Sequence, residues 1–186
     1  MKPPRPREGT CDTRGPMRIE IREETPGDVA AIYALNASAF ETDAEARLVD
    51  ALRANNGLSL SLVASADGEV VGHIAFSLVV IESETRTVHG LGLAPMAVSP
   101  AHQRRGIGGR LIDEGLRRLR ATGHPLCVVL GHANYYPRHG FVRASTHGIR
   151  WEKPVPDDVF FVQELTPGGL AGVSGVVRYR PELDEV

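Results

Sequence analysis

Glycines and arginines cluster near the middle of the chain, where an apolar run gives way to a helical pattern. The first N–H groups of a helix have no partners within the helix and carry the positive end of its dipole, so they attract anions. Glycine lets an anion approach the backbone closely, and arginine adds positive charge around it. The cluster therefore predicts a pyrophosphate site. Its members are Arg104, Arg105, Gly106, Gly108, Gly109 and Arg110.

Two common nucleotide-binding motifs do not fit this cluster. A Rossmann fingerprint needs glycine where Leu111 stands, and a P-loop needs Gly-Lys-Ser/Thr, whereas Arg110 follows Gly109. The competing interpretation is a glycine-rich helix start with solvated arginines. It leaves the glycines unexplained, because each costs about 1 kcal/mol relative to alanine inside a helix.

The segment from Gln103 to Gly108 resembles the Gln/Arg-x-x-Gly-x-Gly/Ala acetyl-CoA motif of the GNAT N-acetyltransferases. Residues 93–98 look like the fourth strand of that family, and residues 131–141 are similar to its Asn…Phe-Tyr-x-x-x-Gly-Phe segment, in a form that resembles a poorly characterised bacterial single-domain subgroup. The resemblance covers residues 17–143. It implies an α+β fold with a central twisted, mostly antiparallel sheet, whose central strands are splayed and flanked by helices.

The resemblance also implies acetyl-CoA (coenzyme A) as the co-substrate and no metal. The splayed strand would bond the pantetheine arm through the backbone of Met96 and Val98, as if the arm were another strand. The full set of expected coenzyme-binding residues comprises Met96, Ala97, Val98, Gln103, Arg104, Arg105, Gly106, Ile107, Gly108, Gly109, Arg110 and Asn134.

Tyr136 matches the tyrosine that serves as general acid in the family, which implies that it protonates the departing thiolate. A phenol has a pKa of about 10 against about 8.5 for a thiol, so it is protonated at neutral pH. Tyr135 is expected to pack in the core, and the N–H of Val98 to lie near the oxyanion. The resemblance therefore predicts acetyl transfer to a primary amine by direct attack. The alternative is an inactive acyl-CoA-binding sensor or interaction module.

The general base stays open, because the family takes it from different strands or uses water. The candidates flank the fourth strand or Tyr136, and each also fits a surface role: Glu82, Glu84, His89, His132 and His139. His73 fits a core histidine. Substrate selection is expected from residues 40–45, where Glu41, Asp43 and Glu45 either attract a cationic amine or cap a helix, and from Trp151 with Phe160 and Phe161. The acceptor is a small-molecule or protein amine.

The elements that must position these residues follow from hydrophobic period and capping signals. One strand is expected at residues 17–22, then helices that begin at Thr25 and Thr42, with Thr42 to Glu45 as a capping box. Three strands follow at 58–64, 70–81 and 87–98, where Pro95 predicts an edge, a bulge or an interrupted ladder. A helix is expected at 104–122, a strand at 126–130, a helical turn at 135–138, and a closing pair of strands at 159–165 and 173–179.

Composition limits the class of protein. The 186 residues suit a single domain, and the net charge of -2 argues against nucleic-acid binding. Two cysteines give neither a disulfide framework nor a thiolate metal site, and no apolar run reaches the ~20 residues of a membrane span. We expect a cytoplasmic protein with a disordered leader at 1–16, a natural start at Met17, the catalytic domain at 17–165, and an extension with a closing strand at 166–186. Closing strands in such folds often pair between subunits, which allows a homodimer.

Overall fold

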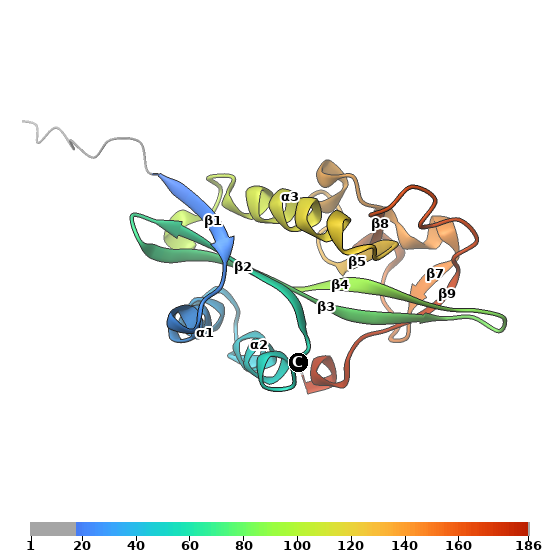
Figure 1. Ribbon diagram of the computed structural model, residues 1–186, viewed down its shortest axis with the longest axis horizontal. Coiled ribbons are helices and arrows are strands. Elements are labelled where there is room, and N and C mark those ends of the chain that lie inside the picture. Colours follow the sequence, from blue (N-terminus) through green and yellow to red (C-terminus); the bar gives the residue numbers. More distant parts are fainter. Residues whose placement is uncertain (1–17, 186) are drawn as a thin grey trace, which may run out of the picture.

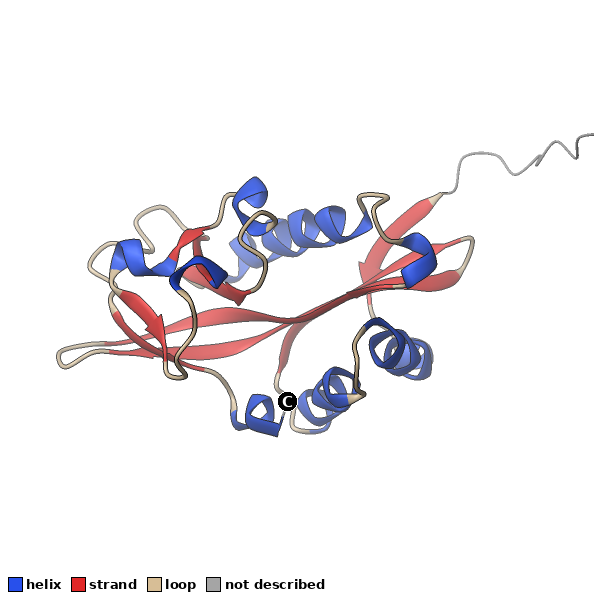
Figure 2. Ribbon diagram, turned by 180° about the vertical axis from the view of Figure 1, so that it is seen from behind, coloured by secondary structure: helices blue, strands red, loops and turns tan. Residues whose placement is uncertain are grey.

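One long sheet crosses the molecule, with helices on both of its faces (Figures 1 and 2). The computed structural model describes residues 18–185, so the expected leader at 1–16 and the start at Met17 lie outside the described residues. The strands are β1 (Ile19–Glu23), β2 (Leu58–Ala66), β3 (Glu69–Glu82), β4 (Thr87–Val98), β5 (Leu126–Leu130), β6 (Val142–Arg143), β7 (Ile149–Trp151), β8 (Phe160–Glu164) and β9 (Gly175–Arg178). The α-helices are α1 (Val29–Ala39), α2 (Ala44–Ala54) and α3 (Ile107–Leu119).

The sheet is mixed and mostly antiparallel, in the order β1-β2-β3-β4-β5-β8-β6, with β9 paired to β3 and to β7. Only the β4–β5 and β7–β9 pairs are parallel among the described strands. Short 3-10 turns connect the elements, and the one after β5 spans Tyr136–His139. The predicted α+β fold class is therefore confirmed.

Two predictions about the elements were wrong. The third helix begins at Ile107 rather than at Arg104, because Arg104 (φ 59°) and Gly106 (φ 79°) both adopt the left-handed conformation, which an α-helix does not admit. The strands expected to close the fold as a pair do not pair with each other. Instead β8 pairs with β5 and β6, while β9 pairs with residues 80–82 of β3, beyond the last β2 partner of that strand at Ser77.

The central strands separate after a short contact. Strands β4 and β5 pair in parallel at three positions, residues 91–93 with 127–129, and β4 then continues to Val98. Residues 94–98 thus have no strand beside them on the β5 side within the described part of the chain. On the other side, the register against β3 slips between Ile74 and Phe76, opposite Pro95. An edge, a bulge or an interrupted ladder was predicted from Pro95, and the slipped register is an irregularity of this kind.

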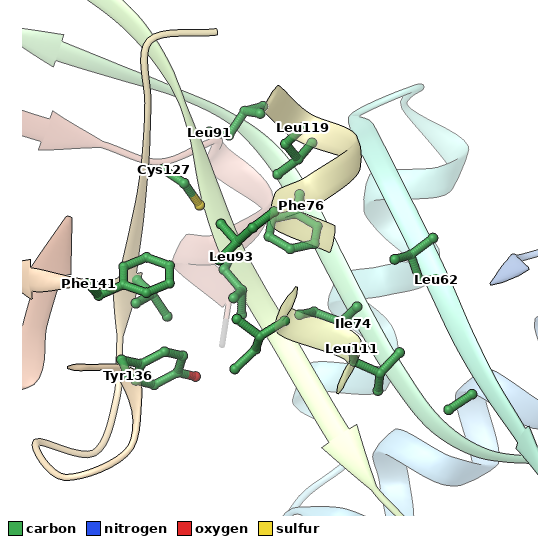
Figure 3. Close-up of a cluster of buried hydrophobic side chains, with 14 of the residues drawn as sticks. Leu62, Ile74, Phe76, Leu91, Leu93, Leu111, Leu119, Cys127, Tyr136 and Phe141 are labelled. Carbon is green, nitrogen blue, oxygen red and sulfur yellow. The ribbon is translucent and has the colours of Figure 1, made fainter. Parts of the chain in front are cut away.

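Side chains alternate between the two faces of the sheet along each strand, and apolar side chains pack against helices on both faces. Leu62 and Phe76 point to α3, where they pack with Leu111 in the main core cluster (Figure 3). Val63, next in sequence to Leu62, points to the opposite face and packs on Ile32 and Val49 of α1 and α2. Helix α3 and the α1–α2 pair therefore lie on opposite sides of the sheet.

A buried polar chain fixes α1 and α2 to their face of the sheet. His73 is fully buried, with Nδ1 3.2 Å from the Asn36 amide nitrogen and Nε2 3.0 Å from the Ser61 hydroxyl. Ser61 donates to Glu24 at 2.5 Å, and Arg53 clamps that carboxylate at 2.8 and 3.0 Å. Burial lowers the pKa of His73 to about 4. The imidazole is therefore neutral at physiological pH, as expected of a satisfied core histidine.

This histidine makes stability depend on pH. A histidine in the unfolded chain takes up a proton near pH ~6.5, whereas folded His73 stays neutral down to about pH 4. The unfolded state therefore binds more protons between these values, and His73 lowers the free energy of unfolding by about 3 kcal/mol as the pH falls through them. In urea unfolding across this range, His73→Gln should have a shallower pH slope than the wild type. The exposed His89→Gln control should keep the wild-type slope, and an unchanged slope in His73→Gln would contradict the assignment.

Candidate active site

The turn between β4 and α3 presents open backbone N–H groups. Helix α3 has Gly106 as its N-cap, and no side chain of the described residues caps it. The first intrahelical bond runs from the Arg110 N–H to the Gly106 carbonyl at 3.1 Å, so the N–H groups of residues 107–109 come before it. Gln103 donates from its side chain to the Val98 carbonyl at 3.1 Å and closes the loop. The result is an uncapped helix start beside the end of β4, where an anion is favoured.

The arginines of this turn have different surroundings. Arg104 and Arg105 are exposed, and Arg104 lines the central cavity described below. Arg110 instead donates to the Ile19 carbonyl at 3.0 Å, which directs it toward β1. The structure therefore brings Arg104 to the cavity and holds Arg110 away from it.

The three glycines of the turn are required for different reasons. A β-carbon at Gly108 would lie 2.5 Å from the Tyr135 hydroxyl oxygen, and one at Gly109 would lie 3.0 Å from Cε1 of His139. Gly106 has open space around it but a φ of 79°, which glycine adopts most easily. A side chain at 108 would thus require the Tyr135 hydroxyl to shift, and one at 109 would make a tight contact with His139, independently of any ligand. The sequence did not reveal either contact.

Of the two adjacent tyrosines, the more buried one is not the one expected. Tyr136, not Tyr135, is the core residue: it is 7% exposed and packs on Phe141 and Phe161, with ring centroids 5.7 and 6.2 Å apart. Tyr135 is half-buried and extends to the start of α3, where its hydroxyl lies against Gly108. The expectation that Tyr135 packs in the core was therefore wrong, because the aromatic cluster behind β5 takes its neighbour.

Tyr136 combines burial with access to the cavity. Its hydroxyl oxygen is directed from the loop after β5 toward β4 (Figure 3), and the residue lines the cavity. Burial raises the pKa of this hydroxyl well above its ordinary value, and a smaller effect in the same direction acts on the pKa of Tyr135. Tyr136 is therefore a protonated donor at any physiological pH.

A cavity of about 730 Å³ joins these features. Its middle is formed by Leu93, by residues 94–96 of the unpaired part of β4, by Leu130 to His132, and by the two tyrosines. Gln103 and Arg104 line it on the α3 side of the sheet. On the α1–α2 side and from the C-terminal segment, the lining residues are Phe40, Glu45, Leu48, Trp151, Lys153, Tyr179 and Leu183. Since α3 and α1–α2 cover opposite faces, the cavity passes through the sheet where β4 and β5 separate.

Of the general-base candidates from the sequence, His132 alone lines this cavity. Glu82 is paired with Arg178 at 2.8 Å, and His139 is held by Asp113 at 2.7 Å through its Nδ1. Glu84 and His89 are exposed and lie away from the cavity lining. Neither Asn134 nor the aromatic pair at 160–161 lines it; Asn134 is exposed and the pair is buried in the core.

The interpretation of Glu45 as the end of a capping box was wrong. Helix α2 begins at Ala44, so Glu45 occupies the second helical position and not the third, from which a side chain reaches back to the cap. Its Oε2 atom is buried without a hydrogen-bond partner among the described residues, and the side chain lines the cavity. The signal in the sequence was its membership of the acidic segment 40–45, from which substrate selection was expected. Lys153, Tyr179 and Leu183 carried no such signal.

Two negative observations concern residues 18–185. No group of three or more His, Cys, Asp or Glu side chains in this range is arranged to hold a metal ion. No helix in the same range is long and apolar enough to cross a membrane.

Comparison with known proteins decides the family. The protein-family model of the acetyltransferase (GNAT) domain matches residues 20–144, about two thirds of the chain. The chain belongs to the GNAT family of N-acetyltransferases. The family identified from the turn and the Tyr-Tyr segment is thus confirmed.

This GNAT acetyltransferase has well-covered relatives. It is 40% identical over 165 residues to the uncharacterized N-acetyltransferase YhbS of Escherichia coli (strain K12), an alignment that spans 88% of this chain and 98% of the relative. The crystal structure of E. coli YhbS in complex with CoA superposes with a TM-score of 0.85 at 38% identity, over 92% of this chain and 95% of that one. A GNAT acetyltransferase from Brucella melitensis in complex with acetyl-CoA gives a TM-score of 0.73 at 38% identity, over 90% and 99%.

The contact between Gly108 and Tyr135 gives a test of the turn. Gly108→Ala forces its β-carbon against the Tyr135 hydroxyl, so it should lower the free energy of unfolding by about 1–3 kcal/mol. Tyr135→Phe removes the oxygen, so the same substitution should cost clearly less in that background. Urea denaturation of the four proteins of this double-mutant cycle measures the coupling.

Gly106→Ala is the matched control. It has no neighbour to clash with but requires a left-handed alanine, which costs about 1–2 kcal/mol. That cost should be the same with Tyr or Phe at position 135. Equal coupling of both glycines to residue 135 would refute the assigned contact.

Proposed function

We propose that this chain transfers the acetyl group of acetyl-CoA to a primary amine by direct attack, with Tyr136 as general acid. One observation carries the proposal: a single cavity runs from Gln103 and Arg104, in the loop just before the uncapped start of α3, along the unpaired part of β4 to Tyr136. An acyl donor with an anionic end and an extended arm suits this path. The CoA and acetyl-CoA complexes of the two similar structures support the same ligand.

The residues of the turn suit the pyrophosphate of acetyl-CoA. The N–H groups of residues 107–109 supply hydrogen bonds, and the exposed Arg104 and Arg105 supply charge. Met96 and Val98 lie in the unpaired segment, where their backbone groups would bond the amides of the pantetheine arm. Such an arm would act as the missing strand beside β4, as expected for backbone groups that no strand pairs on that side. Ala97 pairs with His73 of β3, and Gln103 donates to the Val98 carbonyl, so both help to hold this segment in place.

The chemistry assigns roles to few protein groups. The ammonium form of the acceptor first gives a proton to solvent. The neutral amine then attacks the thioester carbonyl, a C–N bond forms, and the Val98 N–H stabilises the oxyanion of the tetrahedral intermediate. The C–S bond then breaks, and Tyr136 gives its proton to the departing thiolate, which becomes the thiol of CoA. The proton released by the amine returns through solvent to restore the phenol. The amine enters from the α1–α2 side, because the coenzyme fills the α3 side.

A binding module without catalysis is the alternative, and one experiment separates the two. Calorimetry should show acetyl-CoA binding, and a CoA-thiol release assay with a panel of amines should show turnover above the uncatalysed rate. Binding without turnover on any amine would favour the sensor or interaction module. The expectations of a cytoplasmic protein and of a homodimer stay predictions from the sequence.

The role of Tyr136 predicts a change in turnover without a change in binding. Tyr136→Phe keeps the ring that packs on Phe141 and removes the proton donor, so kcat should fall about 100-fold or more while the Kd for acetyl-CoA is maintained. The control is Tyr33→Phe, whose hydroxyl bonds Asp43 outside the cavity, and it should retain wild-type kcat. Wild-type turnover in Tyr136→Phe would remove the residue from the mechanism.

A further inference from the structure

The acceptor end of the cavity contains one carboxylate with an unmet hydrogen-bonding need. Oε2 of Glu45 is buried and has no partner among the described residues. The residue as a whole is only partly buried and lines the cavity, so a ligand can approach its carboxylate from there. A carboxylate oxygen shielded from water without a donor is costly, so a cationic ligand that pairs with this carboxylate is favoured. The acids nearby do not share this state. Asp43 is exposed, accepts from Tyr33 and pairs with Arg47, and Glu41 is exposed; neither lines the cavity.

The rest of this end is mostly apolar and partly aromatic. Its apolar and aromatic members are Phe40, Leu48, Trp151, Tyr179 and Leu183. Trp151 and Tyr179 meet edge to face with centroids 6.1 Å apart, which fixes two aromatic walls. An apolar group next to the amine would be buried favourably against these side chains. A polar ligand would have several charged or hydroxyl groups left without hydrogen-bond partners.

The charges that line the cavity select against a polycation. Among the described lining residues Glu45 is the single acid, while Arg104 and Lys153 are basic. Lys153 pairs with Asp184 at 3.2 Å and lies 5.4 Å from the centre of the Trp151 ring, so a cation already stands at this wall. One carboxylate suffices for one ammonium group. A second or third ammonium would meet Lys153 instead of a partner.

We propose that Glu45 binds the ammonium group of the acceptor, and that the acceptor is a small primary amine with a single positive charge on an apolar stem. This inference rests on the proposed function, since it assigns the acceptor to the end of the cavity opposite the coenzyme. It makes Glu45 a specificity-determining residue, with Phe40, Trp151 and Tyr179 as the walls that hold the stem.

The test measures binding to the protein saturated with CoA, so that it does not depend on turnover. Calorimetric titration with 2-phenylethylamine should show binding, and its neutral analogue 2-phenylethanol and the polycation spermidine should bind more weakly. Glu45→Gln keeps the shape of the side chain and removes its charge. It should weaken 2-phenylethylamine about 10- to 100-fold, the range for loss of a charge-assisted hydrogen bond, and leave 2-phenylethanol unchanged. CoA affinity should be maintained, which also reports that the variant is folded.

Glu69→Gln is the matched control, an exposed acid at the start of β3 outside the cavity lining, and it should bind 2-phenylethylamine as the wild type does. The inference is overturned if 2-phenylethylamine does not bind, if spermidine binds more tightly, or if Glu45→Gln binds the amine as well as Glu69→Gln does. Binding that depends on Glu45 without acetyl transfer to any amine would contradict the proposed function and sustain this inference. If CoA itself does not bind, the proposed function fails, and the same titrations on the free protein decide the role of Glu45.

Discussion

Strands β4 and β5 stay paired for three residues and then part, and the site depends on that separation. Beyond Leu93, the backbone of β4 has polar groups that no neighbouring strand satisfies within the described chain. In a sheet with continuous strand pairing, there would be no opening between the two layers of helices. Here the gap lets one cavity run from the loop before α3, at Gln103 and Arg104, to the α1–α2 layer on the other face. An extended ligand that supplies the missing hydrogen bonds completes the sheet, which couples binding to the fold itself.

The separation is maintained by packing on both sides of the gap. Tyr136 fills the space behind β5 with Phe141 and Phe161, and Gly131 has no side chain because the Tyr136 ring lies where its β-carbon would be. On the other side, the slipped register opposite Pro95 interrupts the ladder between β3 and β4, which resumes at the pair Ile74 and Met96. The same residues that hold the strands apart therefore place the phenol at the middle of the cavity.

The two ends of the cavity differ in chemistry because different layers supply them. The α3 side offers backbone N–H groups and arginines, which suit phosphate. The opposite side offers aromatic walls and a single unpartnered carboxylate, which suit an amine. The His73 network joins α1, α2 and the sheet, and so it holds the layer that carries Glu45 in a fixed position. In the proposed reaction, donor and acceptor would therefore meet from opposite faces of the sheet.

The sequence by itself determined the family, the fold class and nearly all strands and helices, since these follow from local hydrophobic period, capping residues and a contiguous motif. It also predicted roles for Tyr136 and for the turn, because each of these motifs lies within a few neighbouring residues. Only the tertiary structure decided which strands close the sheet, which tyrosine is the core residue, why Gly108 and Gly109 are glycine, and that Glu45 faces the cavity with Trp151 and Tyr179. These outcomes depend on segments that are far apart in the sequence, such as Glu45 and Tyr179, which are separated by 134 residues and line one cavity. The local sequence pattern does not predict such contacts. It reflects the secondary structure that each segment favours and not which segments pack together in the folded chain.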